Sequence, residues 1–216
     1  MVRFELSEVI QSVEQLRELV AKGKRLKFLF FWGHTAPANG TINQACLSQW
    51  WPSSFEIDEV IYPTAEHFMM ASKARLFGDT ATWHRILACG HPKQAKEFGR
   101  QVAGFDEKKW VSERFGFVIA GNYAKFSQNL SLRNYLLETN AKILVEASPY
   151  DRIWGIGLAA DDERALKPQQ WRGLNLLGFA LMQVRERLRE RATTIRSGGA
   201  TTNQPRATPW VSKYER

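Results

Sequence analysis

Residues 62–73 read Tyr62-Pro63-Thr64-Ala65-Glu66-His67-Phe68-Met69-Met70-Ala71-Ser72-Lys73, and this stretch decides most of what the sequence says about the fold. Pro63 and Thr64 are typical of the residues that open a helix, and Gly78 is a natural breaker after it. The sequence therefore predicts a helix over about residues 65–77.

Three functional candidates lie on one face of this helix, because Glu66, Met70 and Lys73 follow one another at spacings of four and three. Glu66 falls in the first turn, where the positive helix end favours a carboxylate. Lys73 adds an amine two turns later, and Met70 offers a soft surface for a flat ligand. The same pattern also fits an ordinary solvated face. His67 is interpreted as a packed structural residue, with a role as a base as the alternative.

The rest of the chain is predicted to be mainly helical. Further helices are expected over about residues 8–22 with Ser7 as N-cap, 80–89, 92–101, 106–125, 131–139 and 174–189. Strands are expected over residues 26–32 and 142–147, and a strand or hairpin arm over residues 55–62. Because strands do not alternate with helices, the expected fold class is α+β, a mostly helical single domain with a small β-sheet.

A second informative stretch, residues 146–157, is rich in turn-forming residues around Asp151. Trp154 supplies a large ring that can stack on a base or a sugar. Gly155 and Gly157 let the backbone bend and approach a ligand closely. The alternative interpretation is a tight turn beside a core tryptophan.

Composition limits the function classes. The 216 residues carry a net charge of +8 with a pI near 9.7, and the five cations and one acid from Arg191 onward contribute half of that excess. Two cysteines without metal-ligand spacing predict neither a disulfide framework nor a zinc site, and favour a cytosolic setting. No apolar run reaches the roughly 18 residues of a membrane span, and no signal peptide is expected at the start.

Three further residues are candidate phosphate partners. Asn175 lies at the start of the last predicted helix, where it either caps the helix or holds a ligand beside free N–H groups. Arg100 and Lys125 offer cations, and each also fits an ordinary surface position. No Walker loop, dinucleotide fingerprint, zinc-protease motif or nucleophile elbow is present, so neither a cofactor nor a metal is expected.

Taken together, these segments resemble the YbiA/NADAR family of YbiA-like N-glycosidases. The matching pieces occur in family order over about residues 27–190. They are Leu47-Ser48-Gln49-Trp50 with Pro52 and Phe55, Tyr62 to His67, Ser72-Lys73-Ala74, Ala124 to Asn129, Leu136-Leu137 with Thr139, Leu144 to Pro149, Asp151, Trp154 to Gly157, and Gly173 to Arg185. The expected organisation is a helical extension over 1–25, an N-glycosidase domain over 26–190, and a basic, disordered tail over 191–216.

The resemblance implies hydrolysis of N-glycosidic bonds. Some family members cleave early riboflavin-pathway ribosylaminopyrimidine phosphates, and others remove ADP-ribose from guanine, so ADP-ribosylated nucleic acid is a further candidate partner. Ile156 departs from the family, because some bacterial members have an acidic residue inside this segment. The departure leaves Glu66, Lys73 and Asp151 as the matched polar centre.

The resulting hypothesis assigns catalysis to Glu66, Lys73 and Asp151, all three expected in one cleft. One carboxylate stabilises the developing oxocarbenium or activates water. Lys73 either donates a proton or captures the opened sugar as a Schiff base. The expected substrate-binding residues are Trp154, Gly155, Arg100, Lys125, Asn175, Met70 and Trp50.

Two other functions compete with this hypothesis. One is a non-catalytic module that binds ADP-ribose or a nucleotide in the same pocket. The other is a nucleic-acid-binding protein that uses the basic tail and exposed tryptophans, whose affinity would fall steeply with salt. The presence of all three polar residues favours the enzyme.

Overall fold

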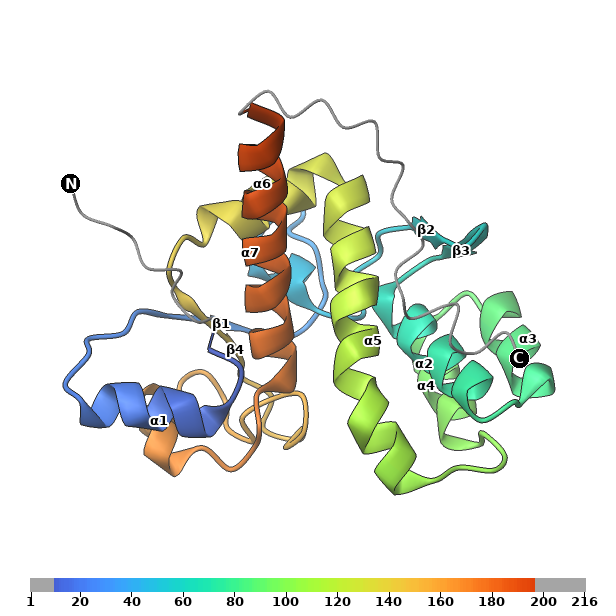
Figure 1. Cartoon of the computed structure of the whole chain (residues 1–216), viewed down its shortest axis with the longest axis horizontal. Coiled ribbons are helices and arrows are strands. Elements are labelled where there is room, and N and C mark those ends of the chain that lie inside the picture. The colour runs from blue at the N-terminus through green and yellow to red at the C-terminus, as the bar shows by residue number, and fades with distance from the viewer. Residues whose placement is uncertain (1–9, 197–216) are drawn as a thin grey trace. The chain divides into compact units, whose positions relative to one another are not determined.

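The computed structural model describes residues 10–196, with side chains described through residue 193. Seven α-helices and four short strands lie within these residues (Figure 1). The helices are α1 (Val13–Ala21), α2 (Ala65–Leu76), α3 (Thr80–Ala88), α4 (Pro92–Arg100), α5 (Glu107–Gln128), α6 (Leu130–Glu138) and α7 (Leu176–Arg196). The strands are β1 (Phe28–Phe31), β2 (Phe55–Ile57), β3 (Val60–Tyr62) and β4 (Ile143–Glu146). The predicted α+β, mostly helical fold class is confirmed.

The chain divides into two compact units, and each is described by itself. The first contains residues 1–48 and 134–187, and the second contains residues 49–133 and 188–216. The three divisions fall after Ser48, within α6 and within α7.

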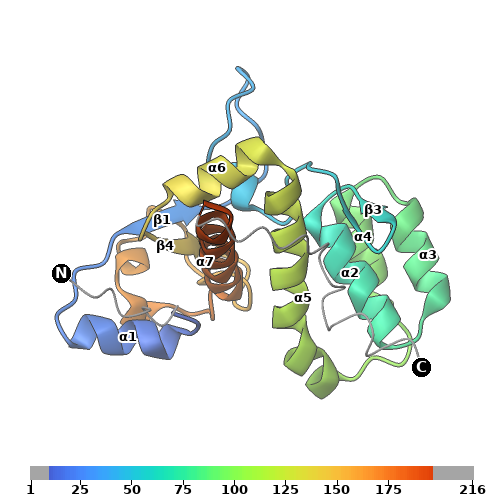
Figure 2. The same ribbon diagram turned by 45° about the horizontal axis from the view of Figure 1, so that its top comes forward.

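In the first unit, β1 and β4 pair in parallel with Phe28 opposite Ile143 and Phe31 opposite Glu146 (Figure 2). Ile143, Leu144 and Val145 are fully or almost fully buried, as expected for a strand covered on both faces. α1 packs its buried residues Val13 and Leu16 into the same unit, and Arg17 Nε donates to the Pro168 carbonyl at 3.0 Å. α1 is therefore part of this unit's packing.

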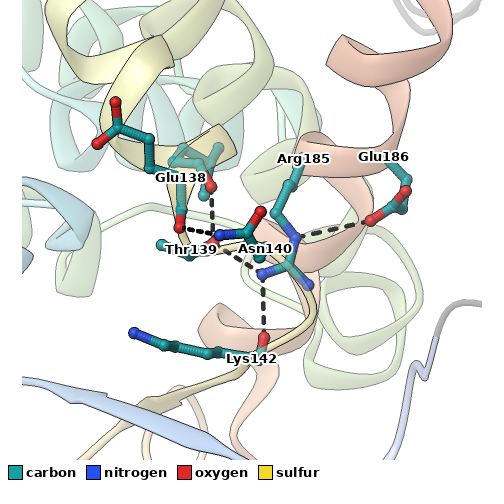
Figure 3. A network of polar contacts seen from close by, with 7 residues as sticks. Glu138, Thr139, Asn140, Lys142, Arg185 and Glu186 are labelled. Atoms are coloured by element: carbon teal, nitrogen blue, oxygen red, sulfur yellow. Dashed lines mark hydrogen bonds and ion pairs between the residues drawn. The ribbon is translucent and has the colours of Figure 1, made fainter.

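A buried arginine closes the turn that leads from α6 into β4 (Figure 3). Arg185 of α7 is 3% exposed, and its Nη1 donates to Thr139 Oγ1 at 2.8 Å and to the Lys142 carbonyl at 2.9 Å. Thr139 Oγ1 in turn donates to the Leu136 carbonyl at 2.6 Å. These bonds tie α6, the turn and α7 together ahead of β4.

In the second unit, α2 is the central helix and packs against α3, α4 and α5. Ten of its twelve residues are buried, which is typical of a helix inside a core. Thr64 caps its start by accepting from the His67 N–H. Gly121 of α5 allows a close approach to α2, since a Cβ there would lie 2.5 Å from the Phe68 ring.

β2 and β3 form a hairpin beside these helices, and Asp58 and Glu59 at its turn have φ values of 51° and 62°. Two residues with positive φ match the twist of a tight hairpin. The aromatic rings of Phe55, Tyr62 and Phe68 pack together beneath it.

Several predicted boundaries are corrected by the structure. The first helix begins at Val13 with Ser12 as its cap, and the predicted cap Ser7 lies outside the described residues. Residues 55–62 form a complete hairpin, so the strands make two separate two-stranded sheets. α7 continues to Arg196, so residues 191–196 of the expected disordered tail are helical, while 197–216 lie outside the described residues.

Within residues 10–196, no helix combines the length and the apolar character that a membrane crossing requires.

Candidate functional site

Glu66 lies in the first turn of α2, and a buried polar network fixes that turn. Glu66 is 3% exposed, and its backbone N–H donates to the Gln49 carbonyl at 3.0 Å. Gln49 is held by Asn122 of α5, whose Nδ2 donates to Gln49 Oε1 at 2.7 Å and to the Val118 carbonyl at 2.8 Å. These hydrogen bonds fix the backbone that carries the Glu66 carboxylate, at the positive end of the helix.

Lys73 is held at the other end of α2 by a carbonyl and two aromatic rings. Its Nζ donates to the Gly99 carbonyl at 2.7 Å and lies 4.1 Å from the centre of the Phe105 ring and 5.6 Å from that of Trp110. Burial lowers the pKa of the Lys73 ammonium below its ordinary value. Glu66 and Lys73 are seven positions apart, which corresponds to about 10 Å along the helix, so the two side chains leave the same face two turns apart.

The other predicted residues of this unit differ in accessibility. Met70 is 7% exposed and packs its sulfur against Gly99. Lys125 of α5 is fully buried, so the alternative of an ordinary surface cation is wrong. Arg100, the last residue of α4, is exposed. Trp50 is partly exposed and meets the His91 ring edge-on at 6.3 Å.

His67 has the structural role that the sequence favoured. Its side chain is fully buried, its Nε2 lies 3.1 Å from the Cys89 carbonyl, and its Nδ1 lies 2.8 Å from Thr64 Oγ1. A carbonyl only accepts, so Nε2 carries the proton and Thr64 donates to Nδ1. Burial lowers the pKa of His67, which keeps this neutral form.

Asp151 organises its own loop in the first unit. Its Oδ1 accepts from the N–H groups of Ile153 at 2.8 Å and Trp154 at 2.7 Å, and its own N–H donates to Ser148 Oγ at 3.2 Å. Asp151 and Trp154 are both partly exposed. The loop thus presents a carboxylate and an indole ring from a fixed backbone.

The same loop is bonded to the end of β4 and the start of α7. The Ile156 N–H donates to the Glu146 carbonyl at 2.9 Å, and the Ile156 side chain is fully buried, so the apolar residue fits its place. Gly155 is buried, and a Cβ there would lie 2.8 Å from the Glu146 carbonyl oxygen. Gly155 is therefore required by backbone packing.

The predicted phosphate site at the start of α7 needs correction. The N–H groups of Asn175, Leu176 and Leu177 donate to the carbonyls of Gly155, Ile153 and Trp154, so these groups are already bonded. The Asn175 side chain is fully buried, with Oδ1 accepting from the Glu146 N–H at 3.0 Å and Nδ2 donating to the Leu144 carbonyl at 2.9 Å. Asn175 joins β4 to α7, and the expectation of free helix-start N–H groups is wrong for these three.

The predicted site residues are shared between the two units. The second unit contains Glu66, Lys73, Met70, Trp50, Arg100 and Lys125, and the first contains Asp151, Trp154, Gly155 and Asn175. That Glu66, Lys73 and Asp151 occupy one cleft stays a prediction.

Sequence reasoning missed the residues that hold these groups. Gln49 stood inside the Leu47–Trp50 motif, which was a usable signal, but nothing local in the sequence links Asn122, Phe105 or Trp110 to α2. Among the described residues, no group of three or more His, Cys, Asp or Glu side chains is arranged to hold a metal ion.

Comparison with known proteins gives a consistent picture. Residues 30–189 match the NADAR domain. N-glycosidase R617 of Acanthamoeba polyphaga mimivirus is 41% identical over 165 residues, which cover 74% of this chain and 95% of that protein. Riboflavin biosynthesis protein VVA0006 of Vibrio vulnificus is 29% identical over 150 residues, 69% of this chain and 37% of that protein.

A solved structure shares the fold. The NMR structure of the E. coli protein YbiA has a TM-score of 0.63 with this chain at 23% identity, covering 84% of this chain and 94% of that one. The domain match, the viral relative and the shared fold agree, and the chain belongs to the NADAR domain family.

Proposed function

We propose that the chain is an N-glycosidase that hydrolyses the bond between a planar base and the ribosyl carbon of a phosphorylated compound. The observation that carries this proposal is that α2 carries both a buried carboxylate, Glu66, and a half-buried ammonium, Lys73. Cleaving a glycosidic bond needs a carboxylate for the oxocarbenium-like transition state and a proton for the leaving group. The name N-glycosidase carried by the mimivirus relative supports the reaction class.

Two substrate classes fit this proposal. One is a ribosylaminopyrimidine phosphate of the early riboflavin pathway, which the name of the Vibrio relative supports. The other is ADP-ribose linked to guanine, either free or within a nucleic acid. A cytosolic setting is also part of the proposal, supported by Cys46 and Cys89, which form no disulfide within the described residues.

The proposed catalytic residues are Glu66, Lys73 and Asp151. When the C1–N bond breaks, its electron pair leaves with the base nitrogen, which takes a proton from the Lys73 ammonium. Water adds to C1 and passes a proton to a carboxylate, Glu66 or Asp151. The contacts of Lys73 with the Gly99 carbonyl and the Phe105 ring favour the charged ammonium and support the proton-donor role that we propose, while the burial that lowers the pKa of Lys73 favours the neutral amine of the Schiff-base role.

The primary experiment measures sugar release from a ribosylaminopyrimidine phosphate and from ADP-ribosylated guanosine. Glu66→Gln keeps the size of the side chain and removes its charge, so turnover should fall about 10²- to 10⁴-fold. Glu97→Gln, at an exposed position of α4, is the matched control and should retain the wild-type rate. An unchanged rate for Glu66→Gln, with the fold intact, would remove Glu66 from the mechanism.

Asp151→Asn tests the loop carboxylate without dismantling the loop. The Asn oxygen can still accept from the Ile153 and Trp154 N–H groups, so only the charge is lost. A loss of about 10²-fold or more in kcat would support a chemical role. If Asp151→Asn keeps the wild-type kcat, the role of Asp151 is limited to organising its loop.

The role of Lys73 is tested by adding cyanoborohydride during turnover and measuring the mass of the intact protein by mass spectrometry. A proton donor forms no imine, so no sugar adduct is expected. A reduced sugar adduct that disappears in Lys73→Gln would establish the Schiff-base route instead. Release of sugar from neither substrate, with tight ligand binding, would favour a non-catalytic ADP-ribose or nucleotide-binding module.

A further inference from the structure

Aromatic side chains occupy alternate positions along β1 and just beyond it, at Phe28, Phe30 and Trp32. The Phe28 and Phe30 rings stack at 5.9 Å, and the Trp171 ring meets Phe28 edge-on at 6.2 Å. Trp32, the residue after β1, is 57% exposed. Exposure along the row is therefore partial at Phe28 and Phe30 and greatest at Trp32.

Tyr150 meets Trp32 at this exposed end. The two ring centres are 6.4 Å apart with a tilt of 50°, and Tyr150 is 86% exposed. The contact between Trp32 and Tyr150 follows from the topology. Parallel strands β1 and β4 end at the same edge, Trp32 directly follows β1, and Tyr150 follows β4 by four residues. Ligands of parallel sheets commonly bind beyond the carboxyl ends of the strands.

Exposed cations flank the loop that follows Tyr150. Arg152 and Arg172 are both exposed, and Arg152 Cγ and Arg172 Cβ would each lie 3.1 Å from a Cβ built on Gly157. The two arginine stems thus frame one turn of the segment that carries Asp151. Guanidinium groups are suited to bidentate contacts with phosphate oxygens.

We propose that Trp32 and Tyr150 form a stacking site for the planar base of a nucleoside phosphate, with Arg152 and Arg172 as the partners of its phosphate. The ligand is the base-bearing part of a small-molecule substrate, so the inference rests on the proposed N-glycosidase function. It adds four residues that the catalytic hypothesis did not include. A stable protein interface buries more than about 1,000 Å², whereas two neighbouring exposed rings with arginines in the following loop fit a small planar, phosphorylated ligand.

The test measures binding of AMP to the full-length chain by calorimetry. Stacking on an aromatic side chain is lost on substitution by alanine, so Trp32→Ala and Tyr150→Ala should each weaken AMP binding roughly tenfold. Trp32→Phe and Tyr150→Phe keep a flat ring and should stay within about threefold of wild type. Ile61→Ala, 65% exposed on β3, is the control and should leave AMP binding unchanged.

Two further probes separate the parts of the ligand. Ribose 5-phosphate carries no base, so its binding should be the same in wild type and in both alanine variants. Arg152→Gln and Arg172→Gln should weaken AMP binding and leave adenosine binding unchanged. Equal AMP affinity in wild type and both alanine variants, or no AMP binding at all, would overturn the proposal. Tighter binding of a short single-stranded oligonucleotide than of AMP, through the same two rings, would overturn the small-molecule assignment.

Failure of this inference is distinguishable from failure of the proposed function. Sugar release without any effect of Trp32→Ala or Tyr150→Ala on AMP affinity or on KM would sink the stacking site alone. AMP binding that depends on both rings, without sugar release from either substrate, would sink the hydrolase and leave the stacking site.

Discussion

At the scale of single residues, His67 shows how burial converts a candidate base into a structural group. The side chain is enclosed, with Thr64 on one ring nitrogen and the Cys89 carbonyl on the other. Both ring positions are occupied, so the imidazole supports the first turn of α2, where Glu66 also lies.

His67 predicts a specific dependence of stability on pH. Burial lowers its pKa in the folded chain below the ordinary value of 6.5, so the unfolded chain takes up a proton first as the pH falls. Its contribution to stability is therefore complete above about pH 6.5 and is lost as the pH falls toward the lower folded pKa.

Denaturant unfolding of wild type and His67→Gln between pH 7.5 and pH 5 checks this dependence. The wild type should lose more unfolding free energy over this range than His67→Gln loses. His84→Gln, at an exposed position of α3, is the matched control for replacing a histidine by glutamine. Equal slopes for wild type and His67→Gln would contradict the prediction.

At the scale of elements, the contact between α7 and β4 depends on a glycine, Gly178, which has no side chain. A Cβ on Gly178 would collide with the Leu144 carbonyl oxygen and with the amide of Asn175, which holds the two elements together. Gly178 therefore sets how closely the helix approaches the strand.

Gly178→Ala is expected to destabilise the protein even though alanine is the better helix former. The helix gains about 1 kcal/mol in propensity, while overpacking of a tight contact costs about 1–3 kcal/mol, and the displaced Asn175 bonds add to the loss. Thermal unfolding should show a lower Tm. Gly90→Ala, where nothing lies within 4 Å, is the control, and a stabilised Gly178→Ala would refute the contact.

The Arg185 network gives a second prediction at this scale (Figure 3). Arg185→Met fills a similar volume but leaves Thr139 and the Lys142 carbonyl without their donor. Hydrogen bonds from a charged donor suggest a loss of about 2–4 kcal/mol in unfolding free energy. Arg187→Met, at an exposed position of the same helix, should change it by less than about 0.5 kcal/mol.

At the scale of the whole molecule, the proposed mechanism draws its carboxylates from both units, Glu66 from the second and Asp151 from the first. Residues that act in one chemical step give strongly non-additive losses. If Glu66 and Asp151 serve the same step, the double variant Glu66→Gln/Asp151→Asn should lose little more kcat than the worse single variant. Losses that multiply would assign the two carboxylates to independent steps. Steady-state kinetics of the four proteins decides between these outcomes.

The sequence by itself determined the family, the mostly helical α+β class and the position of α2. The reason is that caps, breakers and helical spacing are local, and α2 was expected over 65–77 and observed over Ala65–Leu76. The matched segments also predicted the reaction class that the relatives' names carry.

Only the tertiary structure decided what each side chain contacts. In the structure, Lys125 is buried and the Asn175 amide donates to the Leu144 carbonyl of β4. Lys73 contacts the Gly99 carbonyl and the Phe105 ring, and Trp32 contacts Tyr150. These contacts join residues far apart in the chain, and no local spacing encodes them. Burial and partners, which set the charge and accessibility of a group, follow from packing across elements.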